Sequence, residues 1–349
     1  MPSGHAIDVS SYGSVQAAFD ALPDRGGTVH FPAGNYVLND TVAVALAEGQ
    51  HLSVTGEGRA SVIRNRNTDG KALLQVTGVV GSWWPDLKIT IRDLTLVGSP
   101  DSGDAIAVHY PNDTLIDTCF FSGHGGRAVW LGPHGTNVTV RDCWARDCKW
   151  GFRAEHIHHL TLHGNQTRSL NEGQKQAEHL YLDYDCREVR VVNNHFAYGH
   201  AQAIILDGTA QHVICNNTIE GFTKAIDARG VSRDMVIGSN YLHSPIGIHL
   251  TGQCDGYVIA NNTIINAGEW AVLVENAQGS GGHAITGNVM RKSVYQGLRG
   301  IELGDAEYCV VQGNVFDGLT GDAVTATSAT HVIEGNCVRN PEGVLREDH

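Results

Sequence analysis

Carboxylic acids recur at fixed places in a short segment that the sequence repeats. The segment reads small–apolar–x–apolar–x, as in Ala203-Ile-Ile-Leu-Asp207 and Gly247-Ile-His-Leu-Thr251. In an extended strand the apolar second and fourth residues face one side, and the third and fifth residues face the other. Those two outward positions supply the candidate catalytic residues Asp183, Asp207, Asp227, Arg229 and His249. They also supply the candidate substrate-binding residues Trp130, Arg153, Glu155, Tyr181 and Glu275.

Paired carboxyl groups of this kind suit the cleavage or transfer of a glycosidic bond. One carboxylic acid protonates the leaving oxygen, while the other acts as nucleophile or base. If the copies stack as strands, Asp183 and Asp207 lie ~5 Å apart, which suits retention of configuration. Glu155 and Asp207 lie ~9.6 Å apart, which suits inversion. Asp227 would modulate the two catalytic carboxyl groups. The substrate would be bound or polarised by Arg153, Arg229 and His249, and Trp130 could stack on a sugar ring.

The same residues leave other functions open. Tyr181 and His249 suit the acid and base of a uronic-acid lyase or C5-epimerase. A non-catalytic glycan-binding β-helix is another alternative, as is an intracellular isomerase or cyclase of a small metabolite, whose pocket the loop at 169–178 would close. An ion-pair network with the two arginines would serve the stability of the sheet alone, and Trp130 would then be an ordinary, partly covered aromatic residue.

A second repeat, an asparagine ladder, predicts the elements that must position these groups. Aligned segments such as His212-Val-Ile-Cys-Asn-Asn-Thr-Ile219 recur every 22 to 29 residues. Spacings of this size, with three short strands in each repeat, are typical of solenoids. The asparagines would hydrogen-bond along the stack, and the apolar residue two positions later would fill the core. The ladder comprises Asn165, Asn194, Asn217, Asn240, Asn262, Asn288, Asn314 and Asn336, and Cys143 and Cys119 continue it upstream.

The amino-terminal residues resemble those of a known superfamily. Ser14-Val-Gln-Ala-Ala-Phe-Asp-Ala-Leu22 predicts a short helix with Ser14 as its N-cap, which would cover the first coil. Gly26-Gly-Thr-Val-His-Phe-Pro-Ala-Gly-Asn-Tyr36 follows and resembles the first strand of the pectate-lyase-like β-helix superfamily. Together with the ladder, this resemblance implies an all-β fold, a single right-handed parallel β-helix with a short N-terminal capping helix.

The resemblance implies a range of chemistries, because one fold hosts several. The superfamily includes polysaccharide lyases, polygalacturonases, other glycosidases, uronan epimerases and phage tailspikes. In pectate lyases acidic residues hold calcium near an arginine base, and Glu155, Asp183 and Asp207 followed by Arg229 imitate that arrangement. The polygalacturonase motifs are not reproduced in order, since Gly123-His-Gly125 lies upstream of the aspartates. We therefore expect no cofactor, and calcium only if the protein is lyase-like.

Composition narrows the partners and the location. The formal net charge of −13 disfavours binding to nucleic acid. The sequence has no apolar run of the ~18 residues that a membrane span needs, and residues 1–14 lack the features of a signal peptide, so we expect no membrane partner and a cytoplasmic location. The expected partner is a carbohydrate or another small-molecule substrate, and the sequence allows a homo-oligomer. We expect one domain over 1–349, with the cap and first strand over 1–40, coils over 41–340 and a tail over 341–349.

Histidines and cysteines carry weaker signals. Glu155-His-Ile-His-His159 is the densest group of histidines in the sequence. A zinc site needs three or four converging ligands, and no remote partner stands out, so no metal ligands are expected. The eight cysteines form no CxxC pair, which favours free, mostly buried thiols.

Overall fold

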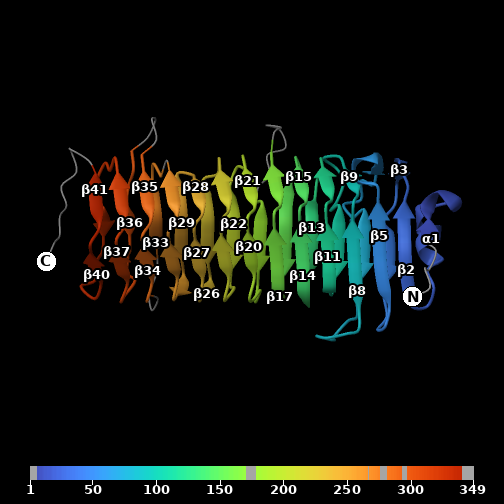
Figure 1. Cartoon of the computed structure of the whole chain (residues 1–349), viewed down its shortest axis with the longest axis horizontal. Helices are drawn as coiled ribbons and strands as arrows, with labels where there is room; N and C mark the ends of the chain where they lie inside the picture. Colours follow the sequence, from blue (N-terminus) through green and yellow to red (C-terminus); the bar gives the residue numbers. More distant parts are fainter. Residues whose placement is uncertain (1–5, 170–177, 266, 276–280, 293–296, 340–349) are drawn as a thin grey trace. The chain divides into compact units, whose positions relative to one another are not determined.

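The structure, a computed structural model, describes residues 6–169, 178–265, 267–275, 281–292 and 297–339. The chain divides into two compact units, residues 1–176 and 177–349. In each unit short strands follow one another around a coil, and successive coils lie side by side (Figure 1). The expected tail at 341–349 and most of the loop at 169–178 lie outside the described residues. The expectation of one domain stays a prediction.

The N-terminal unit consists of three parallel sheets, here called A, B and C in the order in which each coil visits them. Sheet A contains β1 (Ile7–Asp8), β2 (Gly26–Phe31), β5 (His51–Gly56), β8 (Lys88–Arg92), β11 (Asn112–Asp117), β14 (Gly135–Arg141) and β17 (Ile157–His163). Sheet B contains β3 (Gly34–Leu38), β6 (Ser61–Asn65), β9 (Thr95–Val97), β12 (Phe120–Ser122), β15 (Trp144–Arg146) and β18 (Gln166–Arg168). Sheet C contains β4 (Val42–Ala45), β7 (Leu74–Thr77), β10 (Ile106–His109), β13 (Arg127–Gly132) and β16 (Trp150–Glu155).

The C-terminal unit repeats the same three-sheet plan. Sheet A contains β20 (Arg190–Val192), β23 (Val213–Cys215), β27 (Val236–Gly238), β31 (Val258–Ala260), β34 (Ala284–Thr286), β37 (Val310–Gln312) and β40 (Val332–Glu334). Sheet B contains β21 (His195–Ala197), β24 (Thr218–Glu220), β28 (Tyr241–His243), β32 (Thr263–Ile265), β35 (Val289–Arg291), β38 (Val315–Asp317) and β41 (Cys337–Arg339). Sheet C contains β19 (Leu180–Asp183), β22 (Gln202–Asp207), β25 (Lys224–Arg229), β29 (Ile246–Thr251), β33 (Trp270–Glu275), β36 (Ile301–Glu302) and β39 (Val324–Thr325), and a two-stranded ribbon pairs β26 (Val231–Arg233) with β30 (Gln253–Asp255).

The amino terminus carries the one α-helix among the described residues, α1 (Val15–Asp20), with short 3-10 turns at Val9–Ser11 and Gly58–Ala60. Ser14 caps α1 as expected, because its hydroxyl accepts a hydrogen bond from the backbone N–H of Ala17. That α1 serves to cover the first coil stays a prediction. The strand expected over 26–36 is two strands, β2 and β3. They are separated by Pro32, which has no N–H for a ladder, and by a bend at Ala33. No described helix is long and apolar enough to cross a membrane.

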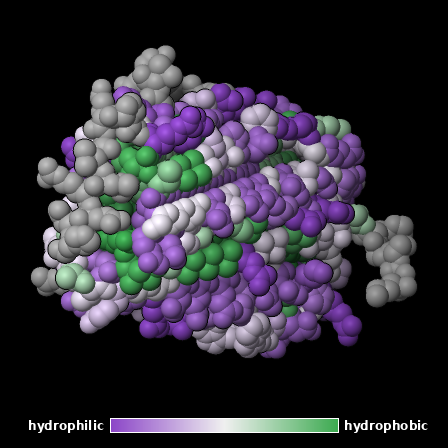
Figure 2. All heavy atoms as spheres, turned by 60° about the vertical axis from the view of Figure 1, so that its left-hand side comes forward, coloured by the Kyte–Doolittle hydropathy of each residue, from purple (hydrophilic) through white to green (hydrophobic). Residues whose placement is uncertain are grey.

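The core is filled by the inward columns that the repeats predict. On sheet C of the C-terminal unit, side chains such as Ile204, Leu206 and Ile248 are fully buried. On sheet A, valines such as Val213, Val236 and Val258 instead face outward in register and are exposed. Figure 2 likewise shows apolar bands between polar ones on the visible face. Branched side chains on this surface support the sheet by packing along the column.

The asparagine ladder is confirmed and lies at the turn between sheets A and B. From Asn194 to Asn336, each side-chain N–H₂ donates to the side-chain oxygen of the next asparagine at 2.9–3.0 Å. The residue before each of these asparagines has a left-handed φ, and it is Asn, Ser or Gly, residue types that adopt this conformation most easily. In the N-terminal unit Asn165 accepts from the backbone of Cys143, and Cys143 and Cys119 are buried, free thiols.

Removing one ladder member should destabilise the fold strongly. Asn262 donates to Ile237 O at 2.9 Å and to Asn288, and it accepts from both the backbone and the side chain of Asn240. The substitution Asn262→Ala leaves these buried groups without partners, so we expect the free energy of unfolding to fall by about 3 kcal/mol. Asn336→Ala, at a partly exposed position, should cost less than about 1 kcal/mol. Urea unfolding of both variants measures the difference, and equal losses would contradict the account of the ladder.

Candidate functional site

The outward columns of sheet C have the expected register in the C-terminal unit. In the third column Tyr181, Ile205, Asp227 and His249 pair across neighbouring strands, and Leu273 follows. In the fifth column Asp183 pairs with Asp207 and Asp207 with Arg229, while Thr251 pairs with Glu275 further along. The structure therefore brings the predicted residues 181–275 onto one face. Their catalytic and binding roles stay predictions.

Asp207 forms the centre of a three-residue cluster on this face. Its Oδ2 accepts hydrogen bonds from the Tyr181 hydroxyl at 2.7 Å and from Arg229 Nε at 2.9 Å. Arg229 also donates from its terminal nitrogen to the Tyr181 oxygen at 2.6 Å. Burial and the hydrogen bond with Asp207 raise the pKa of Tyr181, so its hydroxyl keeps its proton. Asp207 and Arg229 remain about a third exposed, which leaves the cluster open to a ligand.

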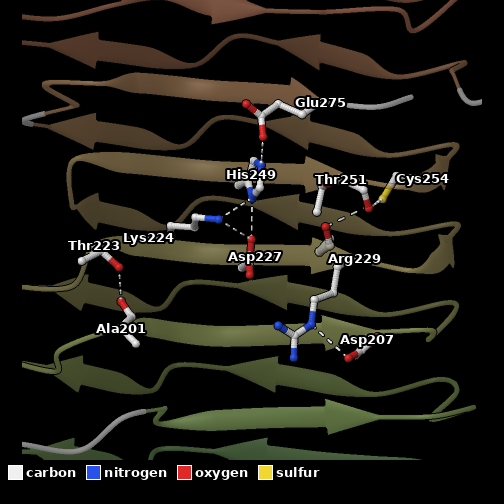
Figure 3. Close-up of polar contacts among 11 residues, drawn as sticks. Ala201, Asp207, Thr223, Lys224, Asp227, Arg229, His249, Thr251, Cys254 and Glu275 are labelled. Atoms are coloured by element: carbon white, nitrogen blue, oxygen red, sulfur yellow. Dashed lines mark hydrogen bonds and ion pairs between the residues drawn. The ribbon is translucent and has the colours of Figure 1, made fainter. Parts of the chain in front are cut away.

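His249 forms the centre of a second cluster, shown in Figure 3. Its Nδ1 lies 2.5 Å from Asp227 Oδ1 and its Nε2 lies 2.9 Å from Glu275 Oε2. Lys224 Nζ lies 2.8 Å from the same Nδ1 and 3.2 Å from Asp227. The side chains of His249 and Asp227 are only 6% and 4% exposed although they lie on the outward face. Side chains on an outward face that served only solubility would be exposed. Titratable side chains that are buried there and contact one another are typical of functional sites.

The second cluster has two alternative proton arrangements. Nδ1 of His249 donates to Asp227 when it carries a proton, and it accepts from Lys224 when it does not. Burial raises the pKa of Asp227, but the hydrogen bond from His249 and the charges of Lys224 and His249 outweigh burial and lower that pKa overall. Asp227 therefore stays ionised and holds the imidazole in place, as a positioning residue does.

The remaining predicted residues, Trp130, Arg153 and Glu155, lie on sheet C of the N-terminal unit. They line a hollow of about 270 Å³, together with Lys71, His109 and Arg127. Trp130 is in register with Arg153, and the His109 ring meets the indole edge-on at 4.6 Å between centroids. Arg127 pairs with Asp104 at 3.0 Å. An indole beside hydrogen-bonding side chains in a shallow hollow can hold a sugar ring.

A group of histidines also gathers in the N-terminal unit, where the sequence predicted no metal ligands. The ring centroids of His134 and His156 lie 5.1 Å apart, and those of His156 and His158 lie 5.7 Å apart. The indole of Trp83 packs against all three imidazoles. Burial lowers the pKa of His134, and the neighbouring His156 and His158 lower it further. A neutral imidazole is able to bind a metal ion.

A family model covers much of this arrangement. The model, described as NosD, periplasmic copper-binding protein, matches residues 92–280, which is more than half of the 349 residues. The chain belongs to the NosD family. The matched residues include Trp130 of the hollow, the three histidines and the His249 cluster. Trp83 lies before the first matched residue. No curated protein matches this NosD-family chain.

Solved structures resemble the fold over nearly the whole NosD-family chain. The A-module of the mannuronan C-5 epimerase AlgE6 of Azotobacter vinelandii is 18% identical, with a TM-score of 0.66 over 96% of this chain and 100% of that one. A DFA-IIIase from Arthrobacter chlorophenolicus A6 is 10% identical, with a TM-score of 0.67 over 96% and 99%. The Streptococcus pneumoniae surface adhesin PfbA is 14% identical, with a TM-score of 0.67 over 92% and 93%. These likenesses confirm the expected fold, a right-handed parallel β-helix.

Sequence analysis missed three residues of this NosD-family chain that belong to the clusters and columns described above. Lys224 lies one residue before the five-residue template, so reading only the template omitted it. Glu302 continues the third column opposite Leu273, and burial raises its pKa. The segment Gly300-Ile-Glu-Leu-Gly304 fits the five-residue template, so the template could have identified Glu302. His134 precedes His156 by 22 residues, one coil, so the repeat length was a signal for this pair.

Proposed function

We propose that this chain is a carbohydrate-active enzyme that hydrolyses or transfers a glycosidic bond on sheet C of the C-terminal unit. The observation that carries the proposal is the register of Asp183 with Asp207, whose Oδ2 is held by Tyr181 and Arg229. Two carboxyl groups on neighbouring parallel strands, with one of them fixed by two donors, provide the pair that glycosidases use. Support at the level of the fold comes from the likeness to carbohydrate-processing β-helix enzymes.

The charge of this face favours a neutral glycan over a polyuronate. Five carboxyl groups stand against the two cations Lys224 and Arg229, and they belong to Asp183, Asp207, Asp227, Glu275 and Glu302. Both cations already lie against carboxylates, at 3.2 and 2.9 Å. The carboxylate of a uronic acid would therefore meet repulsion, whereas a neutral sugar would accept and donate hydrogen bonds. Hydrolysis is thus preferred to β-elimination or C5-epimerisation.

The proposed mechanism retains configuration at the anomeric carbon. Asp207, oriented by Tyr181 and Arg229, attacks the anomeric carbon while Asp183 gives its proton to the leaving oxygen. Water then replaces Asp207, and Asp183 takes back a proton from that water. Neighbouring strands place the two carboxyl-bearing residues ~4.8 Å apart at the backbone, a spacing that suits the retaining arrangement. The reaction needs no calcium.

A glycan screen tests the proposal. Neutral and uronic-acid polymers are incubated with the protein, and reducing ends and ultraviolet absorbance are followed together. We expect new reducing ends from a neutral glycan with no rise in absorbance. Unsaturated products would instead show elimination, for which Tyr181 and His249 are the candidate acid and base. If neither reducing ends nor ultraviolet absorbance increased with any polymer, the result would contradict a role in glycan cleavage.

Copper binding is a second candidate function, because the description of the family names it. Imidazole nitrogen is among the ligands that copper prefers, and His134, His156 and His158 gather around Trp83. The cysteines of the same unit are a poorer fit, because burial raises the pKa of Cys148 to about 12 and keeps it a thiol. A copper ion bound there would have nitrogen ligands and no part in the glycan reaction.

A further inference from the structure

Sheet B of the N-terminal unit has an outward face without carboxyl groups. Its strands β3, β6, β9, β12, β15 and β18 lie in this order, and none of them contains an aspartate or a glutamate (Figure 1). The charged residues of these strands are three exposed or half-buried arginines, Arg64, Arg146 and Arg168. Surfaces that serve only solubility intersperse charges of both signs. In a chain with a formal net charge of −13, a purely basic face therefore indicates a ligand.

The strand register places these arginines in one column. Residues in successive strands pair in the order Arg64, Val97, Ser122, Arg146 and Arg168. Neighbouring strands lie ~4.8 Å apart, so the column spans ~19 Å from β6 to β18. A linear ligand can contact the whole column, whereas a small ion can contact only one end of it.

A fourth arginine, Arg59, packs on an aromatic pair beside this column. Phe120 and Trp144 pair across β12 and β15, and their ring centres lie 5.3 Å apart. The guanidinium carbon of Arg59 lies 3.4 Å from the centre of the Phe120 ring and 5.2 Å from that of Trp144. Packing against the rings holds the guanidinium group in place and leaves N–H donors at its edge for an anion.

Two positive charges share this aromatic pair. The guanidinium carbon of Arg146 lies 5.8 Å from the centre of the same Phe120 ring. Burial lowers the pKa of Arg59, and the charge of Arg146 lowers it further. Among the described residues Arg59 has no ion pair, and Arg146 has one, with Asp147 just beyond β15 at 3.5 Å. An anion bound between the two guanidinium groups would relieve their repulsion.

We propose that this face of sheet B binds an anionic polysaccharide, whose carboxylate or sulfate groups are held by Arg59, Arg64 and Arg146. Guanidinium groups bind such anions through paired N–H donors, and Trp144 can contact a sugar ring beside them. Duplex DNA fits less well, because its charges follow one another every ~1.7 Å, and the strands that hold the arginines lie ~4.8 Å apart. Most phosphates would remain unneutralised beside an acidic chain. The proposed catalytic groups lie on sheet C of the other unit, so this inference is independent of the proposed function.

Affinity measurements with polymers of different charge test the inference. Fluorescently labelled polygalacturonate, dextran sulfate, uncharged dextran and duplex DNA are titrated with the full chain at low salt. We expect an anionic polysaccharide to bind and dextran not to bind, and binding of only one of the two anionic polysaccharides identifies carboxylate or sulfate as the recognised group. Arg59→Gln and Arg146→Gln should each weaken this binding about tenfold. Each should also reduce the slope of log affinity against log salt by about one, whereas Arg146→Lys, which keeps the charge, should keep the slope.

Arg92→Gln is the matched control and should bind as the unchanged chain does. Arg92 lies on β8 of sheet A in the same unit, 54% exposed, with its Nε 3.8 Å from Asp93. Arg146 is comparable, because its side chain is 42% exposed and its Nε also lies beside an aspartate. Unchanged affinity in both Arg59→Gln and Arg146→Gln, or an equal loss in the control, would overturn the site. Failure of both anionic polysaccharides to bind, equal binding of dextran, or tighter binding of DNA would overturn the proposed ligand.

Discussion

Asp207→Asn should lower the turnover of a glycan substrate by about 10³-fold, the size of effect that one acid–base or nucleophilic carboxylate supplies. Asparagine has nearly the same shape, so it keeps a place beside Tyr181 and Arg229, but it is neither a nucleophile nor a base. Since Asp207 and Arg229 are about a third exposed, losing their ion pair should change the free energy of unfolding by no more than about 1 kcal/mol. Initial rates and urea unfolding of the same preparation separate the two effects.

Asp317→Asn is the matched control for this loss. Asp317 lies on β38 of sheet B in the same unit, and its side chain is 34% exposed beside Arg291, as that of Asp207 is 33% exposed beside Arg229. The control removes a comparable carboxylate away from the proposed site and should leave turnover unchanged. Full activity in Asp207→Asn would sink the assignment of this residue, and an equal loss in both variants would show a general effect of charge.

Mild acid should unfold the C-terminal unit, because three buried histidines resist protonation in the folded state. Burial lowers the pKa of His179 and His212 to about 3 and that of His283 to about 4. In the unfolded chain they bind protons near the ordinary value of 6.5, so below that pH the unfolded state binds more protons and is favoured. Their contribution is complete above pH 6.5 and is lost as the pH falls toward 4. Three such groups lower the free energy of unfolding by about 4 kcal/mol per pH unit in this window.

The geometry explains why these imidazoles must stay neutral. The backbone N–H of Val189 donates to His212 Nδ1 at 3.2 Å, and that of Tyr257 donates to His283 Nδ1 at 3.3 Å. A proton on Nδ1 turns this acceptor into a donor and breaks the bond. Asp227 affects stability at lower pH than these histidines do. Because its pKa is lowered in the folded state, its contribution to the free energy of unfolding is lost only below the ordinary aspartate pKa of 3.8.

Urea unfolding at pH 7.5, 6.0 and 5.0 measures this dependence. His212→Asn keeps an acceptor for Val189 but does not titrate, so it should reduce the slope by about 1.4 kcal/mol per pH unit. A free energy of unfolding that stays constant from pH 7.5 to 5.0 would show that these histidines take up protons freely in the folded state.

The sequence predicted the repeated parts of the fold well, because each coil rests on the one before it. The spacing of the asparagines placed Asn217, Asn240 and Asn262 in one ladder, and the alternation of the strands placed Asp183 and Asp207 in register. Both results depend only on periodicity, since a parallel stack forces residues one repeat apart to lie side by side. The free, mostly buried thiols were predicted on another ground, the absence of CxxC pairs, and they are confirmed.

Features outside the repeat could not be predicted in the same way. Trp83 reaches the histidines from a loop that no other coil repeats, so the sequence interpretation of 155–159 lacked both Trp83 and His134. The break between β2 and β3 at residues 32–33 depends on how the first coil turns, and periodicity does not determine it. Burial was a further gap, because Asp227 and His249 occupy outward positions, and only three-dimensional packing shows that both are covered.

Proton magnetic resonance of a defined neutral oligosaccharide in deuterated water tests the central claim most directly, since one time course follows every reaction considered for this face. We expect a new reducing-end signal that appears first with the anomeric configuration of the bond that was cut, no olefinic signal and no deuterium at ring carbon 5. First appearance of the opposite anomer would contradict the roles of Asp183 and Asp207. An olefinic proton, or exchange at carbon 5 without cleavage, would replace glycosidic hydrolysis by proton abstraction from the sugar ring.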